Sequence, residues 1–196
     1  ANTENLGTEG RLKRLWGGVA GSSENPMHSL QAIGQQASNK VFERVATRRV
    51  ADANSRNGAT ADYQIVDKLG EGAMGIVFSA RQTGVNRIVA FKTAKPSYQK
   101  NDESRRRFLY EAHITADLDH SNIVPIYELG ASEEGLLFYS MKLVSGTEWS
   151  RVIRKQSLEE NIEIFMKVAD AMAFAHSKGV IHRDLKPENT MLGKFG

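Results

Sequence analysis

The chain has 196 residues, of which 40% are hydrophobic and 25% are charged, a composition typical of a globular protein with one sizeable core or two small ones. It contains no cysteine, which excludes disulfides and thiolate metal sites and fits the reducing conditions of the cytoplasm. The net charge of +3 comes entirely from residues 1–60, where the basic residues are dilute and only two aromatic residues, Trp16 and Phe42, occur, so we expect no nucleic-acid partner.

No stretch approaches the roughly 18 apolar residues of a membrane span, and the N-terminus lacks the pattern of a signal peptide. We therefore expect this segment to be cytoplasmic and to make no contact with a membrane. The chain begins without methionine and stops at Gly196. For this reason we interpret it as a piece of a longer protein, which could carry a membrane anchor elsewhere.

Residues 1–61 are rich in Gly, Ser, Asn, Thr and Ala, and we interpret them as a mostly flexible leader. Within this leader, residues 40–53 could form a short helix, with Val41, Phe42, Val45 and Arg49 on one side. A helix of this length is marginal in water, so we expect it to fray unless a partner binds it.

Five runs of residues have the character of strands. Three of them, YQIVDKL, IVFSARQ and RIVAFKT, follow Asp62 and alternate apolar with polar residues, as in an antiparallel meander. A helix is expected at about residues 103–118. The last two runs, IYELGAS and GLLFYSMKL, are separated by Glu133-Glu134-Gly135, which favours a hairpin turn. We expect a sheet of five strands with one helix beside it.

The remaining elements are helical. A short helix is expected near residues 148–155, followed by a long one over residues 158–178 with apolar residues at helical spacing. Ser157 and Glu160 have the spacing of a capping box at its start, and Gly179 is suited to the C-cap.

The stretch LGEGAMGIV has glycines at positions 70, 72 and 75, which let backbone amides approach phosphate oxygens closely. A G-x-G-x-x-G pattern is weak by itself. In a dinucleotide-binding fold a helix would follow it, whereas here Ile76 and Val77 continue as a strand. We therefore interpret Gly70, Gly72 and Gly75 as a hairpin loop over phosphates.

Two opposite charges are expected on inward positions near this loop. Lys92 in VAFK lies on the same strand face as Ala90, and Glu111 shares a helical face with Phe108 and Ala112. A buried charge without a partner is costly, so we predict that Lys92 and Glu111 form an ion pair.

The glycine loop, V-A-F-K, the helix glutamate and H-R-D-L-K-P-E-N occur in the order found in protein kinases. Over residues 62–196 the chain resembles the eukaryotic-like serine/threonine protein kinases, particularly those of bacteria. The resemblance implies ATP and Mg²⁺ as cofactors and protein Ser/Thr hydroxyls as substrates. It also implies an α+β protein-kinase-like fold, in which a five-stranded antiparallel N-lobe with one C-helix precedes the first helices and catalytic loop of an incomplete C-lobe.

The resemblance assigns roles to the polar residues. Lys92 would hold the α- and β-phosphates, and Glu111 would hold Lys92. Asp184 would accept or orient the proton of the substrate hydroxyl, Lys186 would contact the transferred phosphate, and Asn189 would be a metal ligand for Mg²⁺. The second Mg²⁺-binding aspartate, in a D-F-G motif, is absent from the sequence, so we expect little activity from this chain alone.

The resemblance also implies an adenine pocket. Leu69, Val77 and Ala90 would cover one face of the base and Met191 the other, with Met141 as the gatekeeper. Backbone groups of Lys142 and Val144 would pair with the adenine edge, and Glu148 would reach the ribose. By the same resemblance, residues 62–144 would form the N-lobe and hinge, and residues 145–196 part of the C-lobe.

Two other classes of protein share some of these features. A small-molecule phosphotransferase of kinase-like fold has a related loop, but Arg183 and Lys186 count against it because that family prefers glycine before the aspartate and lacks the lysine. A pseudokinase or a nucleotide-binding interaction module is the non-enzymatic alternative. The intact motif residues disfavour it for the parent protein.

Overall fold

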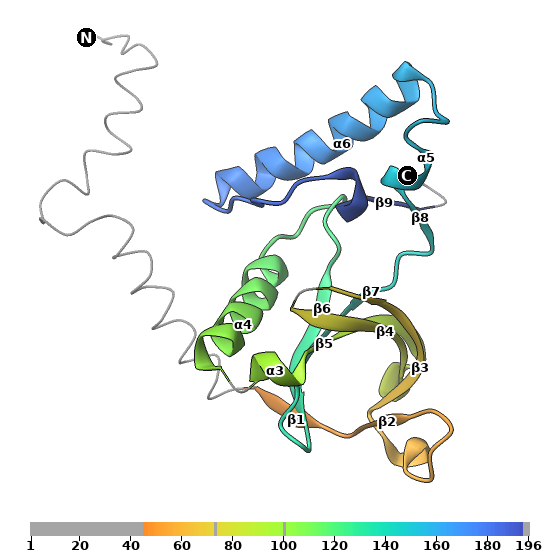
Figure 1. The fold of residues 1–196 in the computed structure, drawn as a ribbon, viewed down its shortest axis with the longest axis vertical. Coiled ribbons are helices and arrows are strands. Elements are labelled where there is room, and N and C mark those ends of the chain that lie inside the picture. The colour runs from red at the N-terminus through yellow and green to blue at the C-terminus, as the bar shows by residue number, and fades with distance from the viewer. Residues whose placement is uncertain (1–44, 73, 100, 194–196) are drawn as a thin grey trace, which may run out of the picture. The chain divides into compact units, whose positions relative to one another are not determined.

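The computed structural model describes residues 45–72, 74–99 and 101–193. Most of the proposed leader, residues 1–44, lies outside these ranges, as does the beginning of the helix proposed at residues 40–53. The main sheet and the helix beside it come from the first two-thirds of the described chain. A second group of elements, built around a long helix, comes from the last third (Figure 1).

Seven strands form the main sheet, in the order β1-β6-β7-β5-β4-β3-β2. The five strands predicted from the sequence are all present, and they pair antiparallel. Their bounds are Tyr63–Glu71 for β3, Gly75–Gln82 for β4, Arg87–Ala94 for β5, Ile126–Ser132 for β6 and Leu137–Lys142 for β7. Short 3-10 turns occupy Gly58–Thr60 (η1) and Thr83–Val85 (η2), the latter connecting β4 to β5.

The other two strands correct the sequence-based interpretation of residues 45–61. Ala46–Arg48 form β1 and Val50–Asp52 form β2, where a helix was proposed and a flexible leader expected. Strand β1 pairs in parallel with β6 at one edge of the sheet, and β2 pairs in parallel with β3 at the other edge. The prediction of a helix was wrong for these residues because the backbone groups of two sheet edges are available to them, whereas an isolated helix is marginal.

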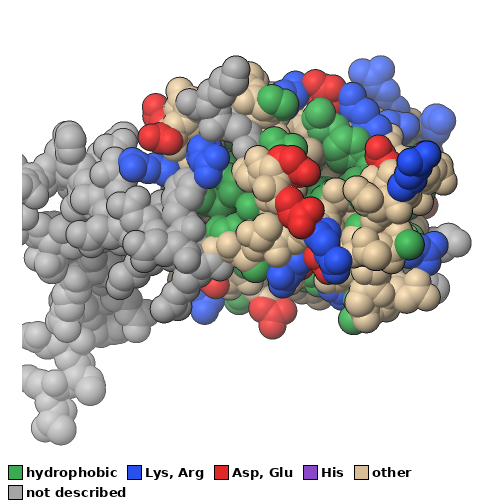
Figure 2. Space-filling model, turned by 90° about the horizontal axis from the view of Figure 1, so that it is seen from below, with side chains coloured by type: hydrophobic (Ala, Val, Ile, Leu, Met, Phe, Trp, Pro, Cys, Tyr) green, Lys and Arg blue, Asp and Glu red, His purple; other side chains and the backbone are tan. Residues whose placement is uncertain are grey.

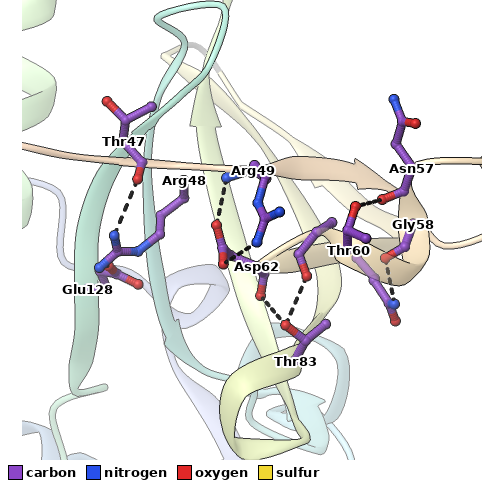
Figure 3. Close-up of polar contacts among 11 residues, drawn as sticks. Thr47, Arg48, Arg49, Asn57, Gly58, Thr60, Asp62, Thr83 and Glu128 are labelled. Carbon is purple, nitrogen blue, oxygen red and sulfur yellow. Dashed lines mark hydrogen bonds and ion pairs between the residues drawn. The ribbon is translucent and has the colours of Figure 1, made fainter.

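Only Arg49 separates β1 from β2, so one short segment reaches both edges of the sheet. Two Cα atoms two residues apart are at most about 7 Å from each other, which means that the sheet must curl until its edges nearly meet. Figure 3 shows the polar contacts of this segment, which we call the belt (residues 46–52). The Arg49 N–H donates to Asp62 Oδ2 at 2.8 Å, and the Arg49 carbonyl accepts from the amides of Asp62 and Tyr63.

The two faces of the sheet pack into two cores, because side chains alternate along each strand. One core is enclosed by the curled sheet and includes a cluster of aromatic rings at centroid separations of 4.4–5.4 Å; it consists of Tyr63, Ala80, Val89, Phe91 and Phe138, with Val50 of the belt and Ile65. The other lies under helix α4 and consists of Ala94, Phe108, Leu109, Ala112, Leu137 and Tyr139, with Val45 against it.

Helix α4 (Asp102–Ala116) agrees with the predicted helix. The Asn101 side chain caps it by accepting from the amides of Glu103 and Ser104. The short helix α3 (Pro96–Gln99) precedes it. Figure 1 shows α4 lying along the sheet, and its buried residues Phe108 and Ala112 are on the face predicted to point inward.

The second group of elements also follows the sequence-based prediction closely. Helix α6 (Leu158–Ser177) begins with the predicted capping box of Ser157 and Glu160, and Gly179 beyond its end has a φ of +76°. The shorter elements are β8 (Gly146–Glu148), α5 (Trp149–Val152), η3 (Pro187–Asn189) and β9 (Met191–Gly193). Strands β8 and β9 pair antiparallel, and Gly146 is required there because a Cβ would lie 1.9 Å from the Leu192 carbonyl oxygen.

Candidate functional site

The predicted ion pair between Lys92 and Glu111 is present. Lys92 Nζ in β5 lies 2.8 Å from Glu111 Oε1 in α4. The two side chains are 18% and 34% exposed, so water screens their attraction less than at an open surface. Glu111 Oε2 is buried and has no hydrogen-bond partner among the described residues. The pair therefore depends on a single carboxylate oxygen.

Tyr139 also contacts this oxygen, and the sequence-based interpretation missed it. The hydroxyl of Tyr139 donates to Glu111 Oε1 at 2.8 Å. Burial raises the pKa of this phenol well above its usual range, and the negative charge of Glu111 adds to the effect. A tyrosine in a strand is most simply interpreted as a core residue, so no sequence signal indicated this contact.

The strand register places several of the predicted adenine-pocket residues beside Lys92. Val77 is the partner of Lys92 on β4, and Met141 on β7 is the partner of Ala90. Ala90 and Lys92 are two residues apart in one strand, so the four side chains share a face of the sheet. Leu69 lies in β3 with half of its surface exposed.

The three glycines of the loop differ in their surroundings. The amide of Gly72 donates to the Gly75 carbonyl at 2.9 Å, which closes a tight turn between β3 and β4. A Cβ on Gly75 would lie 2.5 Å from the Thr93 carbonyl oxygen, so the close approach of β5 requires glycine at this position. Around Gly70 and Gly72 a Cβ would meet nothing within 4 Å. These two positions border open space, where a ligand could approach the backbone.

Glu71, in the same loop, accepts hydrogen bonds from two lysines. The Nζ atoms of Lys68 and Lys95 each lie 2.6 Å from one of its carboxylate oxygens. These bonds, from Lys68 first and then Lys95, lower the pKa of Glu71 to about 2. Because Lys95 follows β5 directly, Glu71 ties the end of β3 to the end of β5.

The segment HRDLKPEN brings a second set of predicted residues together. Lys186 Nζ lies 3.0 Å from Asp184 Oδ2, and Asn189 Nδ2 donates to the carbonyl of Asp184 at 2.7 Å and to Oδ2 at 3.2 Å. The hydrogen bond from Lys186, followed by that from Asn189, lowers the pKa of Asp184. The amide of Asp184 donates to His182 Nδ1 at 3.3 Å, and Arg183 between them adopts the left-handed conformation with φ 64°.

The predicted hinge and ribose residues connect the main sheet with the second group of elements. The amide of Lys142 donates to the Pro125 carbonyl at 3.1 Å, while Val144 follows the end of β7. Glu148 accepts from Arg151 Nε at 3.1 Å, which lowers the pKa of Glu148, so its carboxylate already has a cationic partner. Met191 is the strand partner of Glu148 and is 40% exposed.

A second connection joins the loop after α4 to helix α6. Asn122 Nδ2 donates to the Lys167 carbonyl at 3.1 Å, and the rings of His120 and Phe174 lie with centroids 5.3 Å apart.

Within the described ranges, there is no cluster of three or more His, Cys, Asp or Glu residues with metal-binding geometry, and no helix is both long and apolar enough to cross a membrane.

Comparison with known proteins gives a consistent result. The family model described as "Protein kinase domain" matches residues 63–195. The serine/threonine-protein kinase PknD of Protochlamydia amoebophila is 38% identical over 149 residues, which cover 68% of this chain and 15% of that protein. The serine/threonine-protein kinase pkn3 of Myxococcus xanthus is 35% identical over 149 residues, 74% of this chain and 27% of that protein.

A solved structure is also similar. The crystal structure of the Mycobacterium tuberculosis PknI kinase domain matches with a TM-score of 0.58 and 31% identity, covering 69% of this chain and 56% of that one. The chain thus spans only part of the length of each relative. With the fold, the Lys92–Glu111 pair and the HRDLKPEN segment in agreement with these similarities, the chain belongs to the protein kinase family, with bacterial serine/threonine-protein kinases among its relatives.

Proposed function

We propose that this chain supplies the nucleotide-binding lobe and the catalytic loop of an enzyme that transfers the γ-phosphoryl group of ATP to serine or threonine hydroxyls of proteins. The observation that carries the proposal is the ion pair of Lys92 with Glu111 at 2.8 Å, formed on the sheet face next to the glycine loop. An ammonium has three N–H donors, and only one is needed for Glu111. The others would bind the α- and β-phosphates.

In the same proposal, residues 62–144 are the N-lobe and hinge, and residues 145–196 begin the C-lobe. Leu69, Val77 and Ala90 would cover one face of adenine and Met191 the other, with Met141 as the gatekeeper. Backbone groups of Lys142 and Val144 would pair with the edge of adenine. Glu148 would have to leave Arg151 to reach the ribose.

The polar cluster at Asp184 would act on the substrate hydroxyl. Asp184 is ionised at neutral pH, since its pKa is lowered further below the usual range of an aspartate, so it would accept or orient the hydroxyl proton. Lys186, now beside this carboxylate, would neutralise charge on the transferred phosphoryl group. Asn189 Nδ2 is used by Asp184, which leaves the amide oxygen as the hard ligand that Mg²⁺ prefers. When bound, Mg²⁺ would neutralise charge on the phosphates.

The test is to measure ATP-dependent phosphorylation of a generic Ser/Thr substrate by a protein in which this sequence continues through the rest of a kinase domain. We expect that protein to be active, and Asp184→Asn in it to lower the rate by about 10²- to 10⁴-fold. The 196-residue chain by itself should be far slower, because its sequence contains no D-F-G aspartate to complete the Mg²⁺ site. An inactive extended protein that still binds ATP would instead favour the pseudokinase alternative.

A further inference from the structure

Tyr139 is a buried tyrosine whose hydroxyl reaches the ion pair described above. It donates to Glu111 Oε1 at 2.8 Å, the same oxygen that lies 2.8 Å from Lys92 Nζ. Its side chain belongs to the core under α4 and the residue is only 4% exposed. The Lys92 ammonium also lies 5.4 Å from the centroid of the Tyr139 ring, within the range of a cation–π contact.

Three elements hold Tyr139 in this position. Lys92 in β5 and Tyr139 in β7 are direct partners in the sheet, so their side chains share a face. The ring of Tyr139 packs against Phe108 of α4 with centroids 5.2 Å apart. Phe108 lies three residues before Glu111 on the same side of the helix. The ring is thus fixed by packing, and the hydroxyl is fixed by the ring.

The Tyr139 hydroxyl is the donor in its hydrogen bond to Glu111 at neutral pH. Burial and the adjacent charge of Glu111 raise the pKa of Tyr139 far above neutrality, so the phenol keeps its proton. Glu111 Oε2 has no hydrogen-bond partner among the residues that the structure describes. Hydrogen bonds to charged groups are stronger than neutral ones, and here two of them converge on one oxygen.

We propose that Tyr139 is a positioning residue for phosphoryl transfer, which holds the Glu111 carboxylate and through it keeps the Lys92 ammonium directed at the nucleotide phosphates. The expected effect of Tyr139 on catalysis rests on the proposed function. The placement of Lys92 by Tyr139 can be tested without catalysis.

The test uses Tyr139→Phe, which removes the hydroxyl and keeps the ring against Phe108. The matched control is Tyr63→Phe. Tyr63 is also buried, at 1% exposure, and its hydroxyl donates to a glutamate, Glu128, at 2.6 Å. Tyr63 belongs to the other core, which the curled sheet encloses. Among the described residues, it has no hydrogen bond and no ring contact with Lys92 or Glu111.

The first measurement is the rate at which succinimidyl acetate acylates Lys92 in the 196-residue chain, followed by mass spectrometry with the other lysines as internal references. We expect Tyr139→Phe to raise the rate at Lys92 by about threefold or more, since the carboxylate that restrains the amine is held by one bond fewer. Tyr63→Phe should leave the rate at Lys92 unchanged. Equal rates for Tyr139→Phe and the unmodified sequence, or equal increases for both variants, would overturn the inference.

The second measurement is steady-state kinetics in the extended protein. We expect Tyr139→Phe to lower kcat about tenfold with little change in the KM for ATP, and to cause no further loss in a Glu111→Gln background, because it acts through Glu111. If the losses from Tyr139→Phe and Glu111→Gln were additive, Tyr139 would not act through Glu111. If the extended protein is inactive in every form, the proposed function fails, while the acylation rates still decide whether Tyr139 positions Lys92.

Discussion

Arg48 in β1 and Glu128 in β6 form an ion pair in which Nη2 lies 2.6 Å from Oε1, joining the belt to an outer strand of the kinase sheet. Glu128 also accepts from the buried hydroxyl of Tyr63, which in turn lies 3.0 Å from Ser140 Oγ. The pair therefore connects the belt to the aromatic core inside the curled sheet. Burial raises the pKa of Tyr63 well above its usual range, with the hydrogen bond to Glu128 as the next cause.

The Arg48–Glu128 pair is expected to stabilise the fold. The side chains of Arg48 and Glu128 are 39% and 19% exposed, so this pair should contribute more to stability than an ion pair on the open surface does. In a double-mutant cycle of Arg48→Met and Glu128→Gln, we expect a coupling of about 1 kcal/mol in the free energy of unfolding by urea. The exposed pair of Glu103 and Arg107 on α4 is the control and should give less than about 0.5 kcal/mol. Equal couplings would show that partial burial does not strengthen the Arg48–Glu128 pair.

Gly75 and Gly72 should respond differently to alanine. Gly75→Ala places a Cβ 2.5 Å from the Thr93 carbonyl oxygen, which forces β4 and β5 apart, so we expect a loss of about 2 kcal/mol or more in stability. Gly72→Ala meets no atom within 4 Å and should leave the melting temperature nearly unchanged. If Gly72 borders the phosphates as proposed, the same change should weaken ATP binding, which isothermal titration calorimetry of the extended protein would measure.

The contacts of Glu71 predict a pH dependence. Its pKa is about 2 in the folded protein against a usual value of 4.5. A carboxyl group whose pKa is lower in the folded state stabilises that state when the pH is above the pKa of the group in the unfolded chain. This contribution disappears as the pH falls toward 2. The difference in melting temperature between the unmodified sequence and Glu71→Gln should therefore be greatest above about pH 5 and shrink below it. High salt at neutral pH should also reduce it, because Glu71 is exposed.

A carboxyl-carbon NMR titration would check the origin of that difference. A midpoint for Glu71 near 4.5 would mean that Lys68 and Lys95 do not hold the carboxylate in solution.

Helix α6 exposes large apolar side chains. Leu158, Ile162, Phe165 and Met166 are 47–76% exposed. The face of the molecule at β1 and β2, which lies away from α6, differs in that charged side chains of both signs are mixed with apolar ones (Figure 2). Because contiguous exposed apolar surface favours association, we expect the chain to self-associate at high concentration. Phe165→Lys should reduce the associated fraction in sedimentation velocity, whereas Glu163→Lys, which changes charge without removing apolar surface, should not.

The sequence by itself was sufficient for the elements whose patterns are local. Alternation in residues 63–94 predicted three strands, and Ser157 with Glu160 predicted the start of α6, because these signals depend only on neighbours along the chain. The ion pair of Lys92 and Glu111 could also be predicted, since each residue lies on the inward face of its element and a buried charge requires a partner.

The tertiary structure alone decided the contacts between distant segments. Residues 46–52 have a spacing that favours a helix, but β1 and β2 form because the edges of β6 and β3 offer unpaired backbone groups, which no local pattern records. In the sequence, nothing distinguishes Tyr139 from any other tyrosine in a strand. The register of β5 and β7 places it beside Lys92, and the packing of α4 brings Glu111 within hydrogen-bond distance of its hydroxyl. Strand register and helix docking are set by non-local pairing, so their consequences appear only in the folded chain.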